Sequence, residues 1–223
     1  MIIRVVDFET TDLPPEGRVC EIGWCDVTAT GIGTPHSVLV NPGVPVSPVA
    51  RAAHHIKDSQ LADAMEPRHG FALLDEDCDV FAAHNAKFER AFYEGGKGKW
   101  ICTYRCAMHT WPDAPKYSNQ ALRYWLDLDV DEALAMPLHR AGPDAYVTAH
   151  ILRVLMEVRS VAELVRLTES PVLLKTVGFG KHFGIKWIDV PTDYCEWCLR
   201  HKDMDPDVLF TAAYYLRYGK KGW

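Results

Sequence analysis

The stretch VVDFETT, residues 5–11, places two acids, Asp7 and Glu9, at the end of a short apolar run that begins at Ile2. An apolar run of this length is typical of a buried strand. Residues i and i+2 of a strand point to the same side, so the two carboxylates share one face. Like charges held together cost free energy unless a cation compensates them, and carboxylate oxygens suit hard divalent ions such as Mg²⁺ and Mn²⁺. Strand ends also carry solvated acids, so a metal site is indicated only if the rest of the chain supplies further ligands and a base.

Composition describes a globular protein. Of the 223 residues, 48% are hydrophobic and 24% are charged, and the length predicts one domain or one domain with a small appendage. No stretch is long and apolar enough to span a membrane, and the N-terminus shows no signal-peptide pattern. Seven irregularly spaced cysteines do not resemble a disulfide framework. We therefore expect a cytoplasmic protein with no membrane partner.

The formal net charge of −6 argues weakly against a nucleic-acid partner. The charge is unevenly spread, however, with −8 in residues 1–170 and +2 in residues 171–223. An acidic body that concentrates carboxylates at a metal site, joined to a slightly basic tail, still allows a nucleic-acid substrate, because bound cations offset part of the charge.

The order of the predicted elements indicates an α/β fold with a mixed sheet. An antiparallel meander of strands over residues 2–6, 18–29 and 37–40 comes first, and strands at 78–83 and 100–103 then alternate with helices. The Pro-rich run that ends at residue 48 is predicted to be loop, as are residues 52–56. Helices are expected at residues 58–64, 67–74, 86–93, 104–109, 119–126, 142–158 and 161–167.

A boundary at residues 169–171 separates a domain of residues 1–170 from a small α+β module of residues 171–223. The module is rich in glycine, aromatic and basic residues near its start. Two helices, at residues 193–199 and 206–217, are predicted to follow.

Two further clusters carry chemistry. His84 and Asn85 follow a buried strand, and Glu89 falls in the first turn of the next helix, where the helix dipole favours an acid whatever its function. Asp144 starts the strongest predicted helix, and His139 lies on the loop before it. This spacing places an imidazole near an attacking water while the carboxylate holds a metal. A solvated histidine and a helix-capping acid are the structural alternatives.

Taken in order, D-x-E at residues 7–9, H-N-x-x-F-E at 84–89 and H-R-A-x-x-D at 139–144 resemble the three motifs of the DEDDh 3′–5′ exonucleases. The resemblance covers roughly residues 1–158 and includes Thr10 and Thr11 after the acids and the CEIG stretch at 20–23. It implies a ribonuclease H-like fold. The chain departs from the family at Glu89, where the family usually has Asp, so this ligand is one methylene longer.

The resemblance also implies a mechanism. Asp7, Glu9, Glu89 and Asp144 would hold two divalent metal ions, Mg²⁺ or Mn²⁺, at the scissile phosphate, with His139 as the general base. The products would be nucleoside 5′-monophosphates. The implied substrate is DNA, single-stranded or at the 3′ end of a duplex, and DNA repair is an associated process.

Two alternatives stay open. RNA is a possible substrate, as for an exoribonuclease of the oligoribonuclease kind. A catalytically weak nucleic-acid-binding protein on the same scaffold is the other, and the unusual Glu89 is its support. Nothing in the sequence indicates a protein partner.

Residues near the acids are candidates for substrate binding. Thr10 and Thr11 would offer a backbone amide or hydroxyl to the terminal nucleotide, and Phe88 would stack or wedge there. His84 and Asn85 are candidates as well, although bracing of their turn is the stronger interpretation. His54 and His55 are expected in a loop that approaches the substrate or is simply solvated.

The tail, residues 179–199, resembles the C-terminal module of exodeoxyribonuclease X-like proteins, which favours DNA. Lys181, with other basic residues and with Phe179, Trp187 and Trp197, is predicted to form a basic, aromatic surface that contacts DNA. Alternatively, the aromatic residues form the core of the module, which is the favoured interpretation for Trp197.

Overall fold

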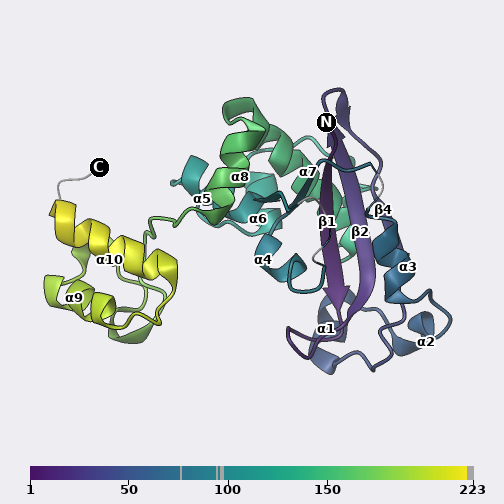
Figure 1. The fold of residues 1–223 in the computed structure, drawn as a ribbon, viewed down its shortest axis with the longest axis horizontal. Helices are drawn as coiled ribbons and strands as arrows, with labels where there is room; N and C mark the ends of the chain where they lie inside the picture. Colours follow the sequence, from purple (N-terminus) through teal and green to yellow (C-terminus); the bar gives the residue numbers. More distant parts are fainter. Residues whose placement is uncertain (76, 94, 96–97, 220–223) are drawn as a thin grey trace. The chain divides into compact units, whose positions relative to one another are not determined.

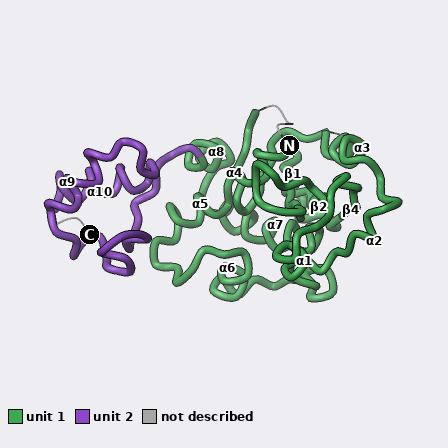
Figure 2. The backbone as a smooth tube through the Cα atoms, turned by 90° about the horizontal axis from the view of Figure 1, so that it is seen from below, with its two compact units in different colours: residues 1–168 green, residues 169–223 purple. Residues whose placement is uncertain are grey.

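The structure is a computed structural model, and it describes residues 1–75, 77–93, 95 and 98–219. The chain divides into two compact units, Met1–Thr168 and Glu169–Trp223 (Figure 2). Each unit is considered by itself below.

A mixed sheet is the centre of the first unit. Its long central pair, β1 and β2, is antiparallel (Figure 1), whereas β1 pairs with β5, and β5 with β6, in parallel. The expected sequence of an antiparallel meander followed by parallel strands is therefore confirmed. Among the described residues, the sheet has six strands: β1 (Ile3–Thr10), β2 (Val19–Thr28), β3 (Gly31–Ile32), β4 (His36–Leu39), β5 (Val80–Ala83) and β6 (Trp100–Cys102).

Strand β1 is buried on both faces, which explains its nearly continuous apolar run. Ile3 and Val5 enter one hydrophobic core, and Val6 and Phe8 enter the core on the opposite face. The strand also continues through Thr10, beyond the predicted end at Val6, because pairing with β2 extends along the acidic positions. By alternation, the two acids of residues 7–9 lie on the face of Val5.

Helices cover both faces of the sheet. The face of Val5 packs against the longest helix, α7, and the opposite face packs around α3 and the segment that follows it. The helices of this part of the chain are α1 (Pro48–His54), α2 (Asp58–Leu61), α3 (Pro67–Ala72), α4 (Ala86–Glu89), α5 (Thr103–Thr110), α6 (Asn119–Trp125), α7 (Ala141–Val158) and α8 (Val161–Glu169).

Two predictions for this region need correction. The run that ends at residue 48 and residues 52–56 were expected to be loop, but α1 forms here because Ser47 accepts a hydrogen bond from the Ala50 N–H and Pro48 suits the first helical turn. The helix expected at residues 86–93 is a single turn, α4, followed by turns up to Phe92.

Helix α7 approaches β2 closely at Gly23. A Cβ atom at this position would lie 2.1 Å from the carbonyl carbon of Ala141, so no other residue fits without displacement. This contact sets the distance between the sheet and the first turn of the helix.

The second unit contains α9 (Thr192–Arg200), α10 (Pro206–Tyr218) and two short 3₁₀ helices, Gly180–His182 and Trp187–Asp189. The β part expected of an α+β module is limited, within the described residues, to one antiparallel bridge between Thr176 and Lys186. Left-handed glycines at 180 and 184 turn the chain before a ladder can extend. No helix in the described part of the chain has the length and apolarity needed to cross a membrane.

Candidate active site

Three carboxylates meet where β1 faces α7. Asp7 and Glu9 come from one face of β1, and Asp144 comes from the first turn of α7. One oxygen of each carboxylate lies within 4.8 Å of the others, and all three residues are half-buried. The sequence spacing and the packing of α7 on the sheet therefore produce a single acidic cluster.

The protein environment disfavours charge on these groups. Burial raises the pKa of Asp7 well above its ordinary value, and the neighbouring carboxylates of Asp144, Glu89 and Glu9 raise it further. Burial likewise raises the pKa of Glu9 to about 8, with Asp144 and Glu21 adding to the effect. A divalent cation would relieve both the desolvation and the repulsion, because it supplies the positive charge that the cluster lacks.

Glu89 is the fourth acid. It lies on α4 with only 4% of its surface exposed, and its Oε2 atom has no hydrogen-bond partner. Burial raises the pKa of Glu89 to about 8. A buried carboxylate oxygen without a donor is costly, so this atom is suited to a cation or to a water bound to one. The donor set thus fits the divalent metal expected from the sequence.

His139 lies on the exposed loop before α7 in the left-handed region, with a φ angle of 56°. Its backbone N–H donates to Asp144 Oδ2 at 3.0 Å, and the charge of the imidazole lowers the pKa of Asp144 against the larger effect of burial. The loop conformation is therefore tied to one of the acids.

One cavity of about 370 Å³ collects the predicted residues. The four acids and His139 line it, together with Thr10 and Phe88. Leu13 and Val49, which the sequence analysis did not single out, add apolar side chains that are 69% and 82% exposed. Asp12 also lines the cavity.

Four predicted substrate-binding residues do not line this cavity. His84 hydrogen-bonds to Thr103 Oγ1 at 2.9 Å and to the Tyr117 carbonyl at 2.7 Å, and burial lowers its pKa to about 4. These bonds brace the turn after β5, which is the role that the sequence analysis favoured for His84 over substrate binding. Asn85 is exposed at the N-cap of α4.

Thr11 and Lys181 are the other two. Thr11 is buried, and its hydroxyl accepts a hydrogen bond from the Arg18 N–H at 3.0 Å. Lys181 belongs to the second unit.

His54 corrects the expectation of a loop histidine. It is the last residue of α1 and is 3% exposed. Its Nδ1 accepts the Ile56 N–H at 3.0 Å, so Nε2 carries the proton and donates to the Thr10 carbonyl at 3.3 Å. Burial lowers the pKa of His54, which favours this neutral form. The residue secures the end of β1 beside the acids.

A buried ion pair joins β2 to the loop before α7. Arg140 donates to both oxygens of Glu21, at 2.8 Å from Nε and 2.6 Å from Nη2, and the Ala141 N–H donates to the same carboxylate at 3.1 Å. Glu21 is 1% exposed. Glu21 is part of the CEIG stretch at residues 20–23, which matched the family pattern. Sequence spacing alone did not predict its pairing with Arg140.

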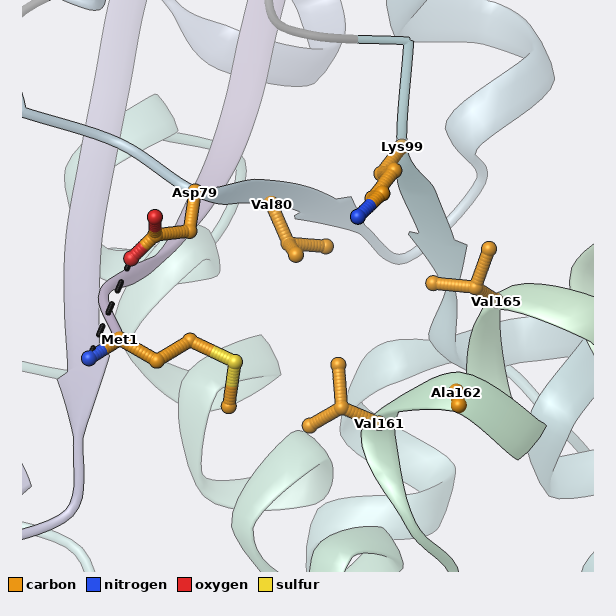
Figure 3. Close-up of a pocket in the computed structure, with 7 residues that line it drawn as sticks. All are labelled: Met1, Asp79, Val80, Lys99, Val161, Ala162 and Val165. Carbon is orange, nitrogen blue, oxygen red and sulfur yellow. Dashed lines mark ion pairs between the residues drawn. The ribbon is translucent and has the colours of Figure 1, made fainter.

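A second cavity, of about 720 Å³, lies at the start of β5 (Figure 3). Its lining is largely aliphatic and includes one acid, Asp79, whose Oδ2 accepts the Ile2 N–H at 2.8 Å and lies 3.9 Å from the N-terminal amine. Although it is the larger of these two cavities, its lining includes only one carboxylate, so it does not offer the oxygen cluster that a metal-ion site needs.

An acidic, cation-binding cavity on a ribonuclease H-like sheet is typical of nucleases that depend on divalent metal ions. The sequence model of the Exonuclease family (RNase_T) matches residues 5–152, and the chain belongs to this family. It is similar to Exodeoxyribonuclease 10 of Escherichia coli strain K12, with 33% identity over 96% of this chain and 99% of that protein. The same protein from E. coli O6:H1 matches equally well.

Solved structures agree with this assignment. Exonuclease X in complex with 5′ overhanging duplex DNA matches 74% of this chain and 99% of its own, with 34% identity and a TM-score of 0.69. The nuclease domain of 3′hExo, a DEDDh family member bound to rAMP, shares the fold over 70% of this chain at 16% identity and a TM-score of 0.55. The predicted family and fold are confirmed, and the chain is a nuclease that acts on nucleic acid with divalent metal ions.

Proposed function

We propose that the protein is a 3′–5′ exodeoxyribonuclease that releases nucleoside 5′-monophosphates. The convergence of Asp7, Glu9 and Asp144 within 4.8 Å carries this proposal, because it forms the anionic site that phosphodiester hydrolysis with metal ions requires. The similarity to Exodeoxyribonuclease 10 supports DNA as the substrate. The DNA in the related complex has 5′ overhangs, and such a duplex presents recessed 3′ ends.

Two divalent ions, Mg²⁺ or Mn²⁺, would supply charge stabilisation at the phosphate and promote loss of a proton from the attacking water. Asp7, Glu9 and Asp144 offer the clustered anionic oxygens, and Glu89 offers its unpartnered Oε2 from α4. His139 would accept the proton at a ring nitrogen, since imidazole is the side chain whose ordinary pKa lies near neutrality.

The terminal nucleotide would contact the remaining cavity lining. Phe88 offers a ring for stacking and is itself supported by Phe92, with ring centroids 5.2 Å apart. Thr10 presents backbone beside the acids, where its carbonyl is held by His54. We propose that residues 1–170 carry this activity and that residues 171–223 form an accessory module like that of exodeoxyribonuclease X-like proteins.

Digestion of matched DNA and RNA oligonucleotides, labelled at either end, tests substrate and polarity together. We expect a 5′-labelled DNA strand to shorten in single-nucleotide steps with Mg²⁺ or Mn²⁺, and no cleavage with EDTA. Faster loss of RNA would assign the chain to the oligoribonuclease kind, and shortening from the 5′ end would overturn the proposed polarity.

A further inference from the structure

A basic loop, residues 175–186, precedes the two helices α9 and α10 of the second unit. The bridge between Thr176 and Lys186 closes its base, and the Val177 N–H donates to the Ile185 carbonyl at 2.8 Å. The Gly184 N–H returns to the Val177 carbonyl, also at 2.8 Å. The loop is thus held in a defined conformation by its own backbone.

The charge of this loop is of one sign. Residues 170–188 contain Lys175, Lys181 and Lys186 but no Asp or Glu, in a chain whose formal net charge is −6. All three lysines are exposed. Lys181 Nζ lies 5.5 Å from the centroid of the Tyr194 ring, which holds its charge beside an aromatic surface.

Aromatic side chains continue this surface. Phe183, two residues after Lys181 in the loop, is 74% exposed. On α9, Tyr194 stacks on Trp197 with ring centroids 5.2 Å apart, and Phe179 of the loop stacks on Tyr194 at 6.2 Å. Trp197 is 37% exposed, so its predicted place in the core is wrong.

The core of the second unit includes Tyr194, with Phe179 packed against it, but not Phe183 or Trp197. Trp187, which the sequence analysis placed on the DNA-contacting surface, is 1% exposed and packs with Val177, Cys198 and Ala212. The two tryptophans therefore have the opposite of their expected positions. Trp187 begins the 3₁₀ helix at 187–189 and is buried, whereas Trp197 lies on α9, where it stacks on Tyr194 and stays partly exposed.

We propose that the basic loop binds single-stranded nucleic acid, with lysines on the phosphates and Phe183 stacked on a base. Aromatic faces combined with cations are the usual means of holding a single strand without regard to sequence. The uniform positive charge favours a polyanion over a protein partner. The inference rests on the proposed function and adds a second contact on the same substrate, outside the acidic cavity.

Binding is measured with the full chain carrying Asp7→Asn, so that DNA stays intact, by fluorescence anisotropy of a labelled single-stranded DNA at several salt concentrations. We expect Phe183→Ala to weaken binding about 5-fold or more, from the loss of one stacked base. Lys181→Ala should reduce the slope of log K against log salt by about 0.7, the value for one phosphate contact on a single strand.

Matched controls lie in the same unit. Arg217→Ala removes an exposed charge from α10, and Phe210→Ala removes a ring that is 41% exposed on the same helix. Both should bind as the parent does. If Asp7→Asn fails to fold, the natural chain in EDTA serves for the same comparison.

The outcomes separate this inference from the proposed function. With Asp7 restored, Phe183→Ala and Lys181→Ala should hydrolyse a dinucleotide at the parent rate, because their contacts lie outside the acidic cavity. Parent-like binding of single-stranded DNA by both variants overturns the inference and leaves the proposed exonuclease activity intact. Failure of the parent to degrade any oligonucleotide overturns the proposed function instead.

Discussion

His139 lines the acidic cavity from an exposed loop, and its backbone rather than its ring is held by Asp144. The imidazole is therefore available to accept a proton. We expect His139→Ala to lower kcat by about 10²-fold or more with little change in DNA affinity, because removal of a general base affects the chemical step. Single-turnover digestion and anisotropy measure the two quantities, with the exposed His69→Ala on α3 as control. Unchanged turnover would remove His139 from the mechanism.

The clustered carboxylates make the metal-free protein sensitive to pH. The folded-state pKa of Glu9 lies near 8, above its ordinary 4.5, so the folded state binds more protons and loses stability as pH rises through this interval. The buried histidines His54 and His84 act in the opposite direction below about pH 6.5, since their folded-state pKa values are lowered. A comparison of parent and variant at two pH values isolates the contribution of Glu9.

We expect Glu9→Gln to raise the melting temperature of the EDTA-treated protein at pH 8.5 and to leave it nearly unchanged at pH 4, below the ordinary pKa of the carboxyl. A gain of about 1 kcal/mol corresponds to about 2–4 °C for a chain of this size. Mg²⁺ should stabilise the parent more than the variant at pH 8.5, because the cation replaces the missing positive charge. An equal shift at both pH values would rule out the charge of the buried Glu9 carboxylate as the cause.

At the level of elements, the Glu21–Arg140 pair fastens β2 to the start of α7. Arg140→Ala leaves Glu21 buried without its partner, so we expect a loss of about 3 kcal/mol in the free energy of unfolding. Activity should fall as well, because Arg140 links the His139 loop to the first turn of α7, and loss of its bond to Glu21 would loosen the positions of His139 and Asp144. Denaturant unfolding and digestion rates measure the two effects.

The double variant Glu21→Gln with Arg140→Ala supplies the control. It should recover part of the lost stability, because no buried charge is then left unpaired. Additive losses in the double variant would show that the two side chains do not act as a pair.

Gly23 sets the separation of α7 from the sheet. In Gly23→Ala, the new methyl group would meet the Ala141 carbonyl at about 2 Å, so α7 must move and carry Asp144 away from Asp7. We expect a loss of about 1–3 kcal/mol in stability and a larger loss of activity than of nucleic-acid binding. Gly178→Ala is a suitable control, since a Cβ there meets nothing within 4 Å.

At the scale of the whole molecule, most of the fold followed from periodicity. The buried run of β1, the 18 residues of α7 and the alternation of later strands with helices are local signals, because each element shows its buried face in its own sequence. Helix α1 gave no such signal. Its residues were assigned to a loop, and its single buried residue is His54.

The four acids and His139 were predicted from motif order, and the structure places them in one cavity. Their individual roles stay predictions for the experiments above. The exposure of Trp197 and the burial of Trp187 could not be predicted, since both residues stand in short apolar and aromatic segments with similar composition.

The sequence by itself determined the residue types available for chemistry, the strand that aligns Asp7 with Glu9, and the helix that begins near Asp144, because these depend on short-range spacing. Tertiary structure alone decided that Asp144 meets the strand acids within 4.8 Å, that Glu89 is buried with a free oxygen, and that Glu21 holds Arg140. These are contacts between residues distant in the chain. They arise from the packing of α4 and α7 on the sheet, which no local pattern encodes.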